Sequence, residues 1–271
     1  MRLWILSDLH LELTQGWDLP SGSDRPEFDV LVIAGDLIPR MERGVRWLAE
    51  RVPDRPVVYV AGNHEFYGGD ERRGVEKAKA AAAGTSVHVL QNETVRIGSV
   101  TFAGATLWVD FALLGEQRRA MIVAGDRMND FRHIRTKRYS QRFRPHHALA
   151  RHTESRNFLE AELRKERSGP LVIVTHHAPH RAQPDPYQAP PSDLLEAAYR
   201  SDLTHLMVPG PDDGRGALRP ADLWIYGHTH TSFQDLVGTS LLVSNAKGYG
   251  PNVGQTTWDN PRFDPHYVIE I

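Results

Sequence analysis

The sequence predicts a mixed α/β sandwich, with the sheet inside and helices outside, and two observations predict it. Short runs rich in Val, Ile and Leu recur along the 271 residues, at 3–6, 30–33, 57–60, 171–174 and 223–226. Their hydrophobicity is continuous rather than alternating, which is typical of strands covered on both faces. Helix-like stretches lie between several of these runs, and such alternation indicates layers of sheet and helix around one core.

Two of the intervening stretches have clear helical features. Segment 71–83 is rich in Ala, Glu, Lys and Arg and is followed by Gly84, which is a common C-terminal stop. Segment 147–167 carries several apolar side chains and ends just before Gly169 and Pro170. We therefore expect a helix in each segment.

Further strands are expected where apolar and polar residues alternate, because alternation is typical of half-buried antiparallel strands. Such segments lie at 94–103, 232–237, 241–244 and 267–271. The middle two join around Gly238. No repeat, low-complexity tract or linker-like composition interrupts the chain, so we expect a single domain over residues 1–271.

Composition excludes several kinds of chemistry. The chain has no cysteine, so disulfides, thiolate metal sites and cysteine nucleophiles are excluded and a metal would have only oxygen and nitrogen ligands. The formal charge of -2 gives no global case for binding nucleic acid or a membrane. No apolar run is long enough to span a membrane, and the N-terminus lacks the pattern of a signal peptide. We expect a cytoplasmic protein with no membrane partner.

Each of the five apolar runs ends in side chains that can bind a metal ion. In chain order these are Asp8 and His10, Asp36, Asn63 and His64, His176 and His177, and His228 and His230. Each alone has an ordinary explanation, such as a turn cap or a surface loop. In open α/β sheets, however, ligands bind beyond the carboxyl ends of the strands, so five parallel runs would bring these groups to one edge. Their shared position favours a metal site.

The chemistry of these residue types suits two divalent ions. Two ions about 3.5–4 Å apart need a bridging carboxylate, and Asp36 is the natural bridge. Asp8, His10 and a distal histidine could complete the coordination of one ion. Asn63 and two further histidines could complete the coordination of the other. Mixed carboxylate, amide and imidazole ligation suits Mn, Fe, Co, Ni or Zn and does not choose among them.

Together the motifs resemble the calcineurin-like metallophosphoesterase superfamily: Asp8-x-His10, Gly35-Asp36, Gly62-Asn63-His64-Glu65, His176 and Gly227-His228-x-His230. The resemblance implies an αββα sandwich of two mixed β-sheets flanked by helices. It also implies a dinuclear centre that hydrolyses phosphomonoesters or phosphodiesters with a metal-bridging water or hydroxide. The ligands it implies are Asp8, His10, Asp36 and His230 for one metal, and Asp36, Asn63, His176 and His228 for the other. His64 resembles the histidine that stabilises the transition state or protonates the leaving oxygen, so Asp36 and His64 are the expected catalytic residues.

Departures from the family pattern narrow the expected branch. Pro39 stands where purple acid phosphatases have an iron-binding tyrosine, and the GlyAspxxAspArgGly signature of protein serine/threonine phosphatases is missing. The chain most resembles the bacterial phosphodiesterase-like and uncharacterised metallophosphoesterases, which implies a phosphorylated small-molecule or nucleotide-like substrate. The alternatives are a nuclease acting on DNA or RNA and a non-catalytic metal-binding scaffold. Retention of every ligand and of His64 argues against the scaffold.

One basic segment lies outside this pattern. Residues 131–153 contain no acidic residue but many arginines. Such a run is commonly a solvated face. The alternative hypothesis is that residues at about 128–153 form a cap over the edge of the sheets where the candidate metal ligands lie. Arg132 would then be a substrate-binding cation, because the planar guanidinium group matches the geometry of phosphate oxygens. Tyr139 or Phe143 would then offer a stacking surface.

Overall fold

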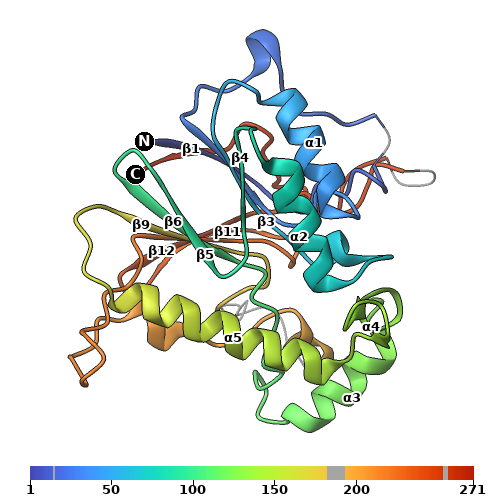
Figure 1. The fold of residues 1–271 in the computed structure, drawn as a ribbon, viewed down its shortest axis with the longest axis vertical. Coiled ribbons are helices and arrows are strands. Elements are labelled where there is room, and N and C mark those ends of the chain that lie inside the picture. The colour runs from blue at the N-terminus through green and yellow to red at the C-terminus, as the bar shows by residue number, and fades with distance from the viewer. Residues whose placement is uncertain (15, 182–192, 253–255) are drawn as a thin grey trace.

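The computed structural model describes residues 1–14, 16–181, 193–252 and 256–271. Two mixed β-sheets pack face to face, and helices cover their outer faces (Figure 1). The expected αββα sandwich is confirmed.

The first sheet has the strand order β13-β1-β2-β3-β4. Its strands are β1 (Arg2–Leu6), β2 (Val30–Ala34), β3 (Val57–Val60), β4 (Val87–Leu90) and β13 (Val268–Glu270). Strands β1 to β4 are parallel, and β13 pairs antiparallel with β1, as its alternating pattern predicts.

The second sheet has the order β11-β12-β10-β9-β6-β5. Its strands are β5 (Glu93–Ile97), β6 (Val100–Ala105), β9 (Leu171–Thr175), β10 (Leu223–Tyr226), β11 (Ser232–Val237) and β12 (Ser240–Asn245). The β11–β12 hairpin turns at Gly238, as expected. The alternating segment 94–103 forms most of a second hairpin, β5–β6, which turns at Gly98.

The five apolar runs divide between the two sheets, three in the first and two in the second, and do not form one parallel set. Continuous hydrophobicity reports that a strand is covered on both faces, but not which strands it pairs with. The sheets nevertheless meet beyond their carboxyl ends, where Ser7 after β1 forms a parallel bridge with Ala246 after β12. All five runs therefore still end at one edge.

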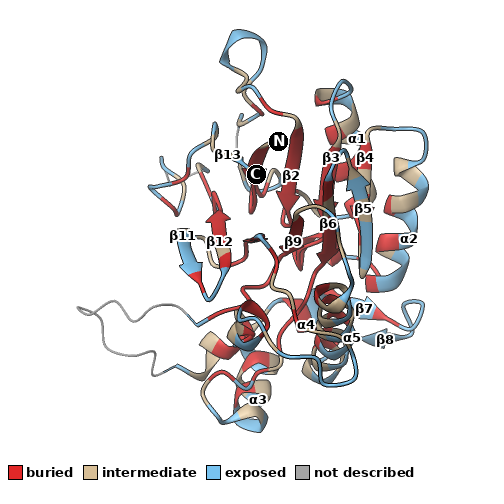
Figure 2. Cartoon of the chain, turned by 90° about the vertical axis from the view of Figure 1, so that its left-hand side faces the viewer, coloured by how far each residue is buried: buried red, intermediate tan, exposed pale blue. Residues whose placement is uncertain are grey.

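Three apolar layers explain why the inner strands are continuously hydrophobic. Ile5 and Val32 of the first sheet and Val172 and Ile225 of the second lie in the layer between the sheets. Neighbouring residues in each strand face outward and pack under helices. Figure 2 shows the inner strands buried and the edge strands β5 and β11 largely exposed.

The helices are α1 (Met41–Arg51), α2 (Glu71–Ala82), α3 (Gln117–Arg127), α4 (Asp130–His133) and α5 (Pro145–Arg164). Helices α1 and α2 cover the first sheet, and α5 covers the second. The two predicted helices correspond to α2 and α5. Short 3-10 helices are η1 (Gly22–Asp24), η2 (His64–Phe66), η3 (Leu194–Ala198) and η4 (Thr204–Met207). Among the described residues, no helix is both long and apolar enough to cross a membrane.

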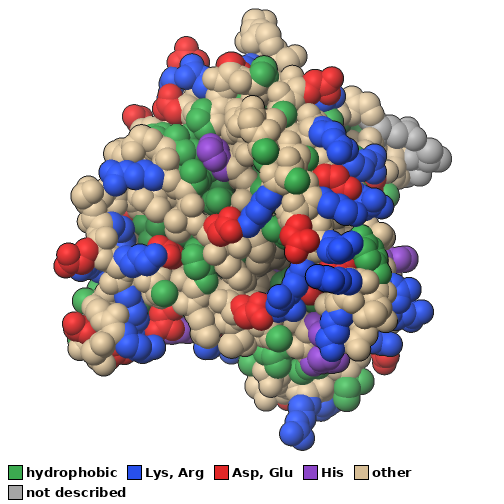
Figure 3. Space-filling view, viewed as in Figure 1, with side chains coloured by type: hydrophobic (Ala, Val, Ile, Leu, Met, Phe, Trp, Pro, Cys, Tyr) green, Lys and Arg blue, Asp and Glu red, His purple; other side chains and the backbone are tan. Residues whose placement is uncertain are grey.

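The basic segment at about 128–153 contains α4, a small hairpin and the N-terminal part of α5. The hairpin pairs β7 (Arg135–Thr136) with β8 (Gln141–Arg142). On the face seen in Figure 3, Lys and Arg side chains gather where α2 and α4 lie in Figure 1.

Candidate metal centre

The chain turns sharply where the strands end, and this directs polar side chains over the edge of the sheets. Asp8 (φ 54°), Asp36 (φ 54°) and His228 (φ 69°) all adopt the left-handed conformation. Non-glycine residues rarely do so, and such strain clusters at functional sites. The glycine before a ligand motif also allows close approach: a Cβ at Gly62 would overlap Asp36 Oδ1, and one at Gly227 would lie 2.5 Å from Asp8 Oδ2.

The buried Glu65 holds two of these turns together. Its carboxylate accepts hydrogen bonds from the backbone N–H of Asp36 (3.0 Å), Gly62 (2.8 Å) and Leu37 (2.7 Å), and from the Tyr59 hydroxyl (2.7 Å). Burial and the Asp36 charge raise the pKa of Glu65 to about 7. Glu65 thus links the loops after β2 and β3 and supports the position of Asp36.

The first group of candidate ligands lies around Asp8, His10 and His230, whose ligand atoms are within 4.8 Å of one another. His230 Nε2 lies 3.2 Å from His10 Nε2 and 3.6 Å from Asp8 Oδ1. On its other side, His230 Nδ1 donates to Asp259 Oδ2 at 3.0 Å. That hydrogen bond leaves Nε2 free to act as a ligand.

The second group contains Asp36, His176 and His228, again within 4.8 Å, and Asn63 lies beside it. His176 Nε2 is 3.0 Å from Asn63 Oδ1, 3.1 Å from His228 Nδ1 and 3.4 Å from Asp36 Oδ2. The His177 ring packs on the His228 ring at 4.2 Å, but its Nδ1 donates to the Thr106 carbonyl at 3.2 Å. Of the two histidines, only His176 places a ring nitrogen within the described groups of candidate ligand atoms.

Asp36 also adjoins the first group: its Oδ2 lies 3.7 Å from His10 Nε2, and Asp36, His10 and His64 form a further set of ligand atoms within 4.8 Å of one another. Burial alone would raise the pKa of the Asp36 carboxyl, but His176, His64 and His10 hold it well below its ordinary range. Asp36 is therefore a charged group between the two sets, where a bridging ligand would lie.

The donor set fits metal ions because two of its atoms, His176 Nε2 and Asn63 Oδ1, direct lone pairs toward each other. His176 Nδ1 donates to the Ala34 carbonyl at 2.9 Å, so in the neutral ring Nε2 carries a lone pair. That lone pair faces Asn63 Oδ1, which is also an acceptor, at 3.0 Å. Only a proton or a cation can relieve this repulsion. Without a metal the proton does so: burial lowers the pKa of His176, but the Asp36 charge outweighs it and raises the pKa to about 10.

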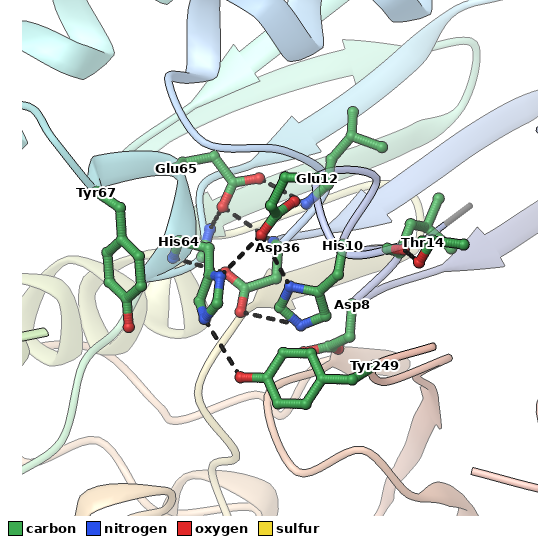
Figure 4. A network of polar contacts seen from close by, with 12 residues as sticks. Asp8, His10, Glu12, Thr14, Asp36, His64, Glu65, Tyr67 and Tyr249 are labelled. Carbon is green, nitrogen blue, oxygen red and sulfur yellow. Dashed lines mark hydrogen bonds and ion pairs between the residues drawn. The ribbon is translucent and has the colours of Figure 1, made fainter. Parts of the chain in front are cut away.

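His64 lies beside the ligand groups and is held on every side (Figure 4). Its Nδ1 donates to Glu12 Oε1 at 3.0 Å, its Nε2 lies 3.4 Å from the Tyr249 hydroxyl, and its ring stacks on Tyr67 at 4.3 Å. Burial lowers the pKa of His64, but Asp36 and Glu12 outweigh it and raise the pKa to about 9. His64 is therefore a positively charged imidazolium beside the candidate ligands at neutral pH.

These residues open into a cavity of about 400 Å³. Asp36, Asn63, His64, His228 and His230 line one part of it. The remaining lining residues are Tyr67, Arg127, Met128, Asn129, Glu196, Tyr199, Arg200, Thr229 and Tyr249. The cavity thus combines the candidate ligands with two guanidinium groups and three phenol rings.

Arg132, the arginine expected to bind substrate, does not line this cavity. Its guanidinium is exposed and donates to the Asp126 carbonyl at 2.6 Å. The two arginines that do line it are each near a carboxylate: Arg127 donates to Asp193 at 2.7 Å, and Arg200 Nε lies 3.4 Å from Glu196.

The expected stacking role of Phe143 is wrong. Phe143 is fully buried and packs against Trp108 and Phe131, because the basic segment folds back as part of the core under α5. Tyr139 is exposed, but it lies near Lys77 and outside the cavity wall. The aromatic rings in the wall are instead tyrosines from other segments.

Two residues beside His64 were missed in the sequence although a signal was present. Tyr249 follows β12, just as the predicted ligands follow their strands, but a Gly-Tyr-Gly sequence is not metal-binding chemistry. Glu12 continues the alternation of Asp8 and His10 by one further step. Its role depends on proximity to His64, which sequence spacing does not report.

Known proteins resemble this chain in sequence and in fold. Residues 1–232 match the family model described as calcineurin-like phosphoesterase. An uncharacterised protein of Acanthamoeba polyphaga mimivirus is 23% identical over 291 residues, covering 98% of this chain and 95% of that protein. The crystal structure of phosphopantetheinyl hydrolase from Mycobacterium tuberculosis is similar with a TM-score of 0.64 and 20% identity, covering 91% of this chain and 89% of that chain.

Proposed function

The chain belongs to the calcineurin-like phosphoesterase family, and from that premise we propose that it hydrolyses phosphodiesters or phosphomonoesters with two divalent metal ions. One ion would be held by Asp8, His10, Asp36 and His230. The other would be held by Asp36, Asn63, His176 and His228. The donor set is compatible with Mn, Fe, Zn, Co or Ni.

One observation carries the proposal: Asp36 belongs to the second group of ligand atoms, lies 3.7 Å from His10 of the first group, and lines the same cavity as ligands from both groups. A metal pair bound there would neutralise charge on a phosphoryl group and activate water for an in-line displacement. A shared carboxylate is the arrangement that such a pair requires. The chain has no cysteine nucleophile, and the proposal requires no covalent intermediate on a protein side chain.

His64 is the proposed proton donor. Its Nδ1 is engaged by Glu12, so the proton available to substrate is the one on Nε2, the nitrogen on the side of Tyr249. An imidazolium in the cavity wall can protonate the departing oxygen or stabilise charge on the phosphoryl oxygens. Both roles need the ring to stay in place, which the stack on Tyr67 favours.

The substrate we propose is a phosphorylated small molecule or a nucleotide-like compound. A cavity of about 400 Å³ is within the range of small-ligand sites. Arg127 and Arg200 would bind its anionic groups, and Tyr67, Tyr199 and Tyr249 would contact its less polar part. Phosphopantetheine esters belong among the candidates because the relative from Mycobacterium tuberculosis is named as a phosphopantetheinyl hydrolase.

The test is hydrolysis by the purified, metal-reconstituted protein. The panel contains a phosphomonoester, a phosphodiester, a cyclic nucleotide, a phosphopantetheine ester and single-stranded DNA, each assayed with Mn²⁺ and after chelation. We expect metal-dependent turnover of at least one small substrate. A protein that binds two ions yet turns over none of them would favour the scaffold alternative.

The nuclease alternative rests on the basic face around α4 and the β7–β8 hairpin, where Lys137 and Arg138 are exposed. Phosphate contacts from such side chains bind nucleic acid without sequence preference and weaken steeply with salt. Faster turnover of single-stranded DNA than of every small ester, with strong salt inhibition, would favour this alternative.

A further inference from the structure

Asp130 is a fully buried carboxylate beside the candidate ligand Asn63. It begins α4, within the segment that the sequence suggested as a cap. Its Oδ1 accepts hydrogen bonds from Asn63 Nδ2 at 2.8 Å and from the Tyr67 hydroxyl at 2.7 Å. Burial raises the pKa of the Asp130 carboxyl despite these two hydrogen bonds. Both of its partners line the cavity, although Asp130 itself does not.

The carboxylate decides which end of the Asn63 amide faces the ligand group. A carboxylate oxygen accepts hydrogen bonds, so only the amide NH₂ can face Asp130 favourably. The carbonyl Oδ1 then points the other way, to within 3.0 Å of His176 Nε2. An amide without this partner could turn over and present its NH₂, which cannot bind a cation.

The charge of Asp130 also affects how strongly the Asn63 amide oxygen can bind a cation. A hydrogen bond to a charged acceptor is stronger than a neutral one, and it increases the electron density on the amide oxygen. Groups that support a metal ligand in this way commonly change metal affinity by about 10- to 100-fold. Through Tyr67, which stacks on His64 at 4.3 Å, the same carboxylate reaches the proposed proton donor.

The backbone around Asp130 runs beside the loop after β3. The N–H of Gly68 donates to the His133 carbonyl at 3.1 Å, and the N–H of Arg135 donates to the Gly69 carbonyl at 2.8 Å. These bonds hold the segment against the loop that carries Asn63. The position of Asp130 is therefore fixed independently of its own side-chain contacts.

We propose that Asp130 is a positioning residue for the second ion: it fixes the Asn63 amide with its oxygen toward the ligand group and strengthens that oxygen as a ligand. The inference rests on the proposed metal-dependent function. On this inference the 128–153 segment supports a metal ligand. The cap hypothesis had instead assigned the segment a contact with substrate.

The test measures the affinity of each ion directly, by titrating the metal-free full chain with Mn²⁺ and following both the free and the bound ion. We expect Asp130→Asn and Asp130→Ala to lower the affinity for the ion bound by Asn63 by roughly 10- to 100-fold. The affinity for the other ion should keep its parental value. Excess Mn²⁺ should restore two bound ions. Tyr67→Phe removes the hydroxyl that donates to Asp130 and accepts from Asn63 Nδ2 at 3.4 Å, but it keeps the shorter bond from Asn63 to Asp130, so it should weaken the affinity for the ion bound by Asn63 by less than Asp130→Asn does.

Asp70→Asn is the matched control. Asp70 is also a buried carboxylate and holds the same segment, since it caps α2 and accepts from the Tyr139 N–H at 3.1 Å, but it touches no candidate ligand. The inference is supported if both variants lose stability but only the Asp130 variant changes in metal affinity. Parental affinity for both ions in Asp130→Asn, or an equal loss for both ions, would overturn it. If the parent itself does not bind two ions, the proposed function fails instead.

Discussion

Glu12 Oε1 lies 3.0 Å from His64 Nδ1, so a carboxylate from the loop after β1 holds an imidazole from the loop after β3. The same oxygen is 3.5 Å from His10 Nδ1. Glu12 therefore connects a candidate ligand with the proposed proton donor. Because it engages Nδ1, it determines which nitrogen of His64 is available to substrate.

This pairing predicts a graded loss of activity. His64→Ala should keep both metal ions and lower turnover by roughly 10²-fold or more, the usual effect of losing a general acid. Glu12→Gln keeps the shape of the side chain but removes the charge, so its loss should be smaller. Substrates with very good leaving groups should be affected less by either change. Equal losses for good and poor leaving groups would contradict proton donation.

Asp36 should be required for both ions. We expect Asp36→Asn to abolish hydrolysis almost completely, because the amide has only one oxygen and no negative charge with which to bridge two cations. Its metal affinity should fall by more than the roughly 10- to 100-fold typical of losing a supporting contact. Elemental analysis checks this together with turnover. Two bound ions and intact turnover would show that the shared-ligand assignment is wrong.

Metal binding should release protons at neutral pH. In the metal-free protein the pKa of His176 is raised to about 10, so the ring is protonated, whereas a metal ligand must be neutral. Calorimetry of Mn²⁺ binding in buffers of different ionisation enthalpy counts the protons released. Below pH 10, apparent affinity should rise by about tenfold per pH unit for each proton. Binding without proton release would contradict the protonated state of the site.

The same raised pKa affects the stability of the metal-free protein. The stabilisation from protonated His176 is fully present below its unfolded pKa of about 6.5 and is lost as the pH rises through about 10. The metal-free protein should therefore lose stability toward alkaline pH, while the metal-loaded protein should not show this loss. Thermal unfolding of both forms across this pH range provides the measurement.

The arginines of the cavity should matter more for substrate binding than those of the basic segment. Losing a hydrogen bond to a charged group costs about 1.5 kcal/mol, so Arg127→Gln and Arg200→Gln should each raise KM for an anionic substrate by roughly tenfold. The matched control replaces Arg132, Arg135 and Arg138 together with Gln and should leave KM close to its parental value. A salt-dependent rise in KM in the triple variant would return the segment to a substrate-binding role.

Most of the strands, the mixed α/β class and the candidate ligands could be predicted from the sequence alone, whereas β4 could not. Apolar runs such as 57–60 and 223–226 are local features, and their hydrophobicity reports burial on both faces whatever the rest of the chain does. Asn63, His228 and His230 could be recognised for the same reason, because each stands directly after such a run. Local spacing and residue chemistry sufficed for these predictions.

The pairing of strands and the partners of the site residues could not be predicted in this way. Nothing in the runs indicates that three belong to one sheet and two to the other, because pairing depends on contacts between distant segments. Likewise, Glu12 reaches His64 across 52 residues and Asp130 reaches Asn63 across 67. Such contacts form only when the two sheets and the segment after α3 pack together, so the surroundings of each ligand follow from the fold rather than from the neighbouring residues in the chain.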